Sequence, residues 1–166
     1  MTAKWQGRVL VASSLLFACG VIGFDVEEPI PEQVVEGSPI GALLPVSLFE
    51  FPLQIDIESK TRAMDTGPAH SAQLKAITLT VLVPAGETFE FLDSLRIFVA
   101  ADGLERREVA KLEEVPPSGS ISLQIVPGVD LLPYVEKGAT LSATATGHMP
   151  RQTIRFAGKV VVTIKV

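Results

Sequence analysis

Apolar and polar residues alternate along much of the chain from residue 46 onward. In one segment Leu141, Ala143 and Ala145 are separated by Ser142 and Thr144. A period of two is typical of strands that bury one face. The same alternation recurs in four other segments, so the pattern predicts strands over residues 53–58, 77–83, 121–125, 141–146 and 160–166.

Two more strands are expected over residues 95–100 and 108–112, because Asp102-Gly103 between them is a strong turn signal. Seven or eight strands in about 120 residues predict an all-β domain over residues 46–166. It resembles the antiparallel immunoglobulin-like β-sandwich class, without the Cys and Trp core pair of antibody domains. A single helical turn is expected over residues 129–135, with Asp130 as its cap.

The first 18 residues have the layout of a signal peptide. Lys4 and Arg8 are followed by an uncharged run over residues 9–24. That run is shorter than the roughly 20 residues a bilayer-spanning helix needs, so a permanent transmembrane anchor is disfavoured.

Leu16, Ala18 and Cys19 resemble the lipobox of bacterial lipoproteins, from which Phe17 departs. The resemblance implies lipidation of Cys19, removal of residues 1–18 and anchoring in the bacterial cell envelope. With Gly20 after the Cys, it implies the outer membrane, on its periplasmic or its surface face. Two or more acyl chains would supply stable anchoring. The alternative is an ordinary secretory signal cleaved after Ala18 or Gly20, with an unmodified Cys19.

Residues 19–45 are expected to form an acidic, Pro-rich tether. From residue 25 to 45 there are five acids, four Pro and no Lys or Arg, a composition typical of extended chain. Two apolar stretches, residues 34–35 and 40–44, are expected to dock on the domain or on a partner, the domain being favoured.

Composition excludes several functions. A single Cys rules out an internal disulfide and a multi-thiolate metal site, and two His leave little for another metal centre. The net charge is −5, and it becomes −7 once residues 1–18 are removed, since two of 14 cations and none of 19 acids are lost. We therefore expect no nucleic-acid partner, no metal and no cofactor.

Few residues suggest catalysis. Asp56 and Glu58 would lie about 7 Å apart on one strand face, but a solvated face produces the same pair. Asp65-Thr66-Gly67 matches the triplet of aspartic proteases, yet no second triplet is present and a turn is favoured. No nucleophile elbow, P-loop or dinucleotide-binding glycine pattern occurs.

Three residues are candidates for binding a partner: Arg106, Arg107 and His148. Arg106 and Arg107 belong to a charged cluster that would also serve as a hydrophilic hairpin protecting a sheet edge. His148 lies in the expected last hairpin loop, where an exposed imidazole is commonly without function.

The sequence thus favours a non-catalytic, lipid-anchored envelope protein whose sandwich binds another envelope or extracellular component. The alternative is a carrier of lipid or another hydrophobic ligand. Its mouth would be lined by Leu131, Leu132, Tyr134 and residues 88–92.

Overall fold

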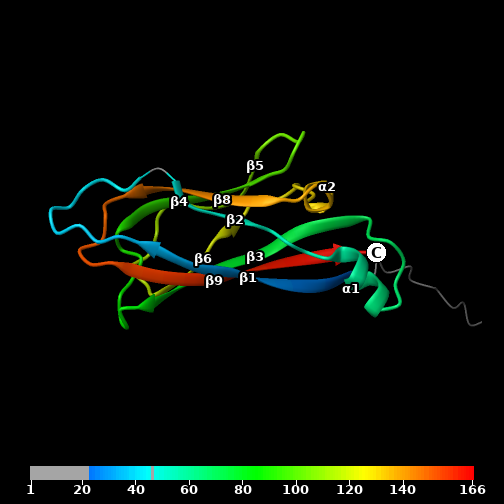
Figure 1. Cartoon of the computed structure of the whole chain (residues 1–166), viewed down its shortest axis with the longest axis horizontal. Helices are drawn as coiled ribbons and strands as arrows, with labels where there is room; N and C mark the ends of the chain where they lie inside the picture. Colours follow the sequence, from blue (N-terminus) through cyan, green and yellow to red (C-terminus); the bar gives the residue numbers. More distant parts are fainter. Residues whose placement is uncertain (1–22, 46) are drawn as a thin grey trace, which may run out of the picture.

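Two antiparallel sheets stack face to face in the computed structural model, which describes residues 23–45 and 47–166 (Figure 1). One sheet has the order β1-β9-β3-β6 and the other β2-β8-β4-β5-β7. The chain is therefore an all-β sandwich. The strands are β1 (Gly23–Val35), β2 (Ser47–Pro52), β3 (Ser71–Val83), β4 (Leu92–Ala100), β5 (Arg107–Leu112), β6 (Ser120–Ser122), β7 (Gln124–Ile125), β8 (Thr140–Gly147) and β9 (Ile154–Lys165).

Apolar side chains from both sheets fill the space between them. Phe156 of β9 and Phe89 of the loop before β4 are fully buried, and their rings meet edge to face with centroids 5.7 Å apart. Phe49 of β2 packs on the other side of Phe156, at 5.9 Å. Aromatic contacts thus link the two sheets across one core.

Most of the expected strands are confirmed. Residues 77–83, 95–100, 108–112 and 141–146 lie within β3, β4, β5 and β8, and residues 160–165 lie within β9. Gly103, in the turn between β4 and β5, has a φ of +70°, which explains the glycine there.

The expected tether is wrong for residues 23–35, which form the edge strand β1 along β9. Val26, Ile30 and Val35 are buried in the core, and Pro29 and Pro31 lie on an edge strand, where proline is tolerated. The ladder shifts register between Ile30 and Gln33, so the apolar residues do not follow a strict period of two. Of residues 40–44, only Leu44 docks its side chain in the core.

Two other predicted strands differ. Residues 53–56 keep alternating burial without joining a ladder, and helix α1 (Ile57–Ala63) follows. Asp56 caps that helix by accepting a hydrogen bond from the N–H of Ser59, at 2.9 Å. The extended segment therefore ends at Asp56. Residues 121–125 are split: β6 pairs with β3 in one sheet, and β7 pairs with β5 in the other.

Helix α2 (Leu132–Glu136) lies where a helical turn was expected. The Asp130 Oδ1 accepts hydrogen bonds from the N–H of Leu132, at 3.0 Å, and of Ala72, at 2.9 Å. Asp130 therefore holds the start of α2 against β3. Within the described residues, no helix is long and apolar enough to cross a membrane.

The sandwich has two distinct ends (Figure 1). The helical end carries α1 and α2 (Figure 1). The first residues of β1 and β3 and the last residue of β9 lie there too, because Gly23 and Ser71 both pair with Lys165. The loop end carries residues 36–45, 84–91 and 148–153. Backbone hydrogen bonds join two of these loops: Ser38 donates to Pro150, and Met149 donates to Ala42, both at 2.8 Å.

Candidate functional site

Arg106 and Arg107 are committed to contacts within the domain. The guanidinium of Arg106 lies 3.7 Å from the centre of the Phe98 ring and donates to the Ser142 hydroxyl at 3.2 Å. Arg107 pairs with Glu105 at 3.2 Å. Both arginines are exposed, and both help to shape the hairpin between β4 and β5.

The carboxylates considered for catalysis also have structural contacts. The hydrogen bond from the backbone N–H of Ser59 lowers the pKa of Asp56 below its usual value, so Asp56 is a charged cap. Glu58 pairs with Arg62 one helical turn away, at 2.8 Å. Asp65 follows α1 with a φ of +53°, so its triplet forms a turn, as expected.

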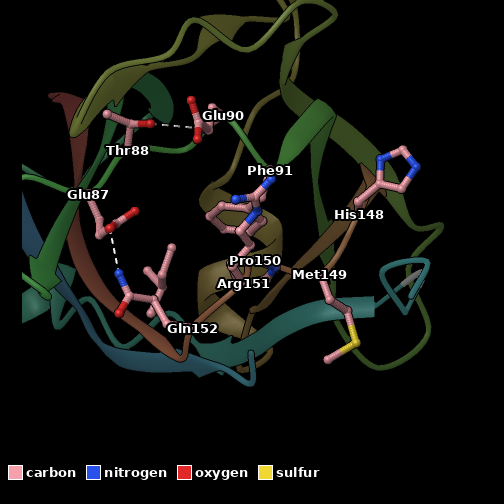
Figure 2. A pocket seen from close by; sticks show the side chains of 10 residues that line it. Glu87, Thr88, Glu90, Phe91, His148, Met149, Pro150, Arg151 and Gln152 are labelled. Carbon is pink, nitrogen blue, oxygen red and sulfur yellow. Dashed lines mark hydrogen bonds between the residues drawn. The ribbon is translucent and has the colours of Figure 1, made fainter. Parts of the chain in front are cut away.

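His148 lies at the loop end, where its side chain helps to line a hollow. The hollow has a volume of about 560 Å³. His148 and Met149 lie on one side of it and Glu87 and Gln152 on the other, where Gln152 donates a hydrogen bond to Glu87 (Figure 2). The lining is mainly polar, and it includes Arg151.

The structure does not bring the three candidate residues together. Arg106 contacts Ser142, whereas His148 comes six residues later, just beyond the end of β8. At about 3.3 Å per residue this separates Ser142 from His148 by roughly 20 Å. The arginines and the histidine therefore belong to different surfaces.

Most of the exposed large apolar side chains lie at the loop end. The sequence predicts docking by residues 34–35 and 40–44, on the domain or on a partner, but not which of their side chains stay exposed. Six large apolar residues are exposed in the described part of the chain, and five lie at this end: Val34, Ile40, Leu43, Leu82 and Val83. Ile40 is 89% exposed and Leu43 is 77% exposed. We call these five residues the apolar patch.

Members of the patch adjoin both the sheet and the hollow. Val34 and Val83 both pair with Arg155, from opposite sides of β9. Leu43 forms a backbone bridge with His148, whose ring lines the hollow. The apolar stretch at residues 40–44 was the available sequence signal, but only the fold shows which of its side chains remain in solvent.

The mouth expected for a carrier does not form. Residues 88–92 precede β4 at the loop end, because Leu92 pairs with Gly147, whereas α2 precedes β8 at the helical end. Leu131, Tyr134 and Phe89 are buried in the core. A smaller hollow of about 390 Å³ lies between α1 and α2, and Ile55, Leu132 and Val135 contribute to its wall.

No group of three His, Cys, Asp or Glu side chains within residues 23–45 and 47–166 could hold a metal ion. Cys19, the expected lipidation site, lies outside the described residues.

No protein-family model matches the sequence, and no curated protein matches it. Two similar solved structures are both of the BFDV capsid protein. The decameric form has a TM-score of 0.39 and 9% identity, covering 86% of this chain and 98% of that chain. The 60-mer has a TM-score of 0.35 and 10% identity, covering 87% and 93%. Likeness at this level says nothing about what the present chain does.

Proposed function

We propose that this chain is a bacterial envelope lipoprotein, acylated at Cys19, whose sandwich binds another envelope or extracellular protein and performs no catalysis. The lipobox-like residues 16–19 support the anchor, and the outer membrane is the membrane that Gly20 favours. Residues 1–18 are a signal peptide in this proposal. The contacts of Asp56 and Glu58 within α1 support a binding role over a chemical one.

The observation that carries the binding role is the apolar patch at the loop end. Apolar side chains that are exposed on a folded domain, beside polar groups, are typical of interaction sites. Leu43 and His148 are adjacent there, so an apolar anchor and a polar group face the same partner. Of the three candidate residues, His148 is the one that this surface includes.

Crosslinking in the native envelope, from two positions on the sandwich, tests whether the partner binds at the loop end. A photoreactive residue replaces Leu43 in one version of the protein and Arg107, in the hairpin between β4 and β5, in another. We expect a defined crosslinked partner from position 43 and not from position 107. The same partner from both positions, or none from position 43, would refute binding through the loop end.

A second candidate function is that of a hydrophobic-ligand carrier, which the partly apolar hollow between α1 and α2 favours. Native mass spectrometry of the purified protein separates the two functions. A copurified lipid that is lost on Leu132→Glu would support the carrier. Its absence would leave the binding module.

A further inference from the structure

We infer that the helical end of the sandwich lies against the lipid bilayer and that the loop end points away from it. The inference rests on the acylation of Cys19 proposed above. The helical end would then meet the lipid headgroups, and the loop end would stay free for a partner.

Only a short chain separates the proposed anchor from the fold. Gly23 is already the first residue of β1 and pairs with Lys165. Four residues of extended chain from Cys19 to Gly23 span at most about 14 Å. A lipid on Cys19 therefore leaves no room for a long spacer, and Gly23 must stay close to the membrane surface.

Gly23 lies at the helical end of the sandwich. Adjacent strands are about 4.8 Å apart, so the Gly23–Lys165–Ser71 row places the start of β3 about 10 Å from Gly23. Residues 64–70 connect that point to α1, and α1 lies beside Gly23's end of the sheets (Figure 1). Helix α1 and the turn after it are thus within reach of the headgroups.

The helical end exposes charged side chains of both signs and one large apolar side chain. Lys60 and Arg62 of α1 are exposed, as are the acids Asp56, Glu58 and Asp65, so this segment has no excess of positive charge. Met64, at the end of α1, is the one large exposed apolar side chain of the described residues outside the apolar patch. We expect contact set by the short anchor and by Met64, with little dependence on salt.

The outer face of the β1-β9-β3 sheet is the surface on which the molecule would otherwise lie flat. Its exposed charges pair within the sheet: Lys159 with Glu27 at 3.1 Å, and Arg155 with Glu32 at 3.3 Å. Lys75 of β3 pairs with Asp25 of β1 as well, and β1 itself has no Lys or Arg. This face offers no positive surface to anionic lipid, so an upright orientation is favoured.

The loop end then stands well away from the bilayer. The 13 residues of β1 run from the helical end to the loop end, a distance of about 40 Å at 3.3 Å per residue. The apolar patch and His148 are thereby presented to a partner rather than to lipid.

The test places a fluorophore at each end of the acylated protein in vesicles of phosphatidylethanolamine and phosphatidylglycerol. Because acylation occupies the Cys19 sulfur, Met64→Cys and Ile40→Cys each give one free thiol for labelling. Both side chains are exposed, so both variants should fold. Lys60→Cys and Leu43→Cys provide a second matched pair, and a quencher is attached to the lipid headgroups.

We expect quenching several-fold stronger at positions 64 and 60 than at 40 and 43, in low and high salt alike. Equal quenching at both ends, or stronger quenching at the loop end, would overturn the orientation while leaving the anchor intact. If protein that carries Cys19 were released from the vesicles as readily as the Cys19→Ser variant, the anchor itself would be wrong, and the orientation with it.

Discussion

Gly23 and Lys165 are partners in the β1–β9 ladder, so the first residue of β1 lies at the same end of the sandwich as the last residue of β9. The backbone N–H of His70 also donates to the carbonyl of Lys165, at 2.7 Å. Three segments therefore converge where a lipid on Cys19 would be attached. The acidic residues that follow Gly23 belong to the folded domain.

Replacing Gly158 by Ala should destabilise the sandwich. Gly158 lies in the middle of β9, between Ile30 of β1 and Leu79 of β3. An added Cβ would lie 2.3 Å from the Thr78 carbonyl oxygen, a backbone atom that cannot move alone. We expect a loss of about 1–3 kcal/mol in the free energy of unfolding, measured by urea denaturation.

Gly67→Ala is the matched control, since nothing lies within 4 Å of its added Cβ. Its free energy of unfolding should stay within about 0.5 kcal/mol of wild type. Equal losses in the two variants would contradict the close packing of β9 against β3.

Most strands of the sandwich could be predicted from the sequence, because the central strands bury one face and expose the other. The alternation of apolar and polar residues misled where a segment alternates in burial without pairing in a sheet, or pairs in a sheet without strict alternation. Residues 53–56 alternate in burial although they join no ladder, and Asp56 then starts a helix. In β1 the register shift after Ile30 and the two prolines hid a strand within what reads as a tether.

The candidate site was less predictable for a related reason. Arg106 and Arg107 stood out by charge, but stacking on Phe98 and pairing with Glu105 emerge only from the fold. The apolar patch joins strands and loops that are far apart in sequence, such as Val34 and Val83 on either side of β9. No local pattern reports such a grouping.

Asp130→Ala should loosen α2 from β3. The variant removes the acceptor for the backbone N–H groups of Leu132 and Ala72, and Ala72 is fully buried. We expect a loss of about 1–3 kcal/mol in the free energy of unfolding. Asp130→Asn retains an acceptor oxygen and should lose clearly less. Hydrogen exchange at the Ala72 amide reports the effect directly, and unchanged protection in Asp130→Ala would be inconsistent with this contact.

Stability should fall in acid. A hydrogen bond from Lys75 lowers the pKa of Asp25 from its ordinary 3.8, and one from Lys111 lowers that of Glu113 from its ordinary 4.5. The folded state therefore binds fewer protons than the unfolded chain in acid. These contributions are fully present above the ordinary pKa values and are lost as pH falls through the lowered ones.

Urea denaturation between pH 7 and pH 3 measures this dependence. We expect a nearly constant free energy of unfolding down to about pH 5 and a decline below it. The Asp25→Asn, Glu113→Gln double variant should decline less steeply. Because both groups are exposed, high salt should also reduce the effect. An identical acid slope in the double variant would show that these pairs do not contribute.

Acylation at Cys19 is the claim on which both the proposed anchoring and the orientation of the sandwich depend. The most direct measurement is metabolic labelling with radioactive palmitate of cells that produce wild-type or Cys19→Ser protein. We expect label in the wild-type band and none in the Cys19→Ser band, at matched protein amounts. Equal labelling of the two, or no label in either, would contradict it.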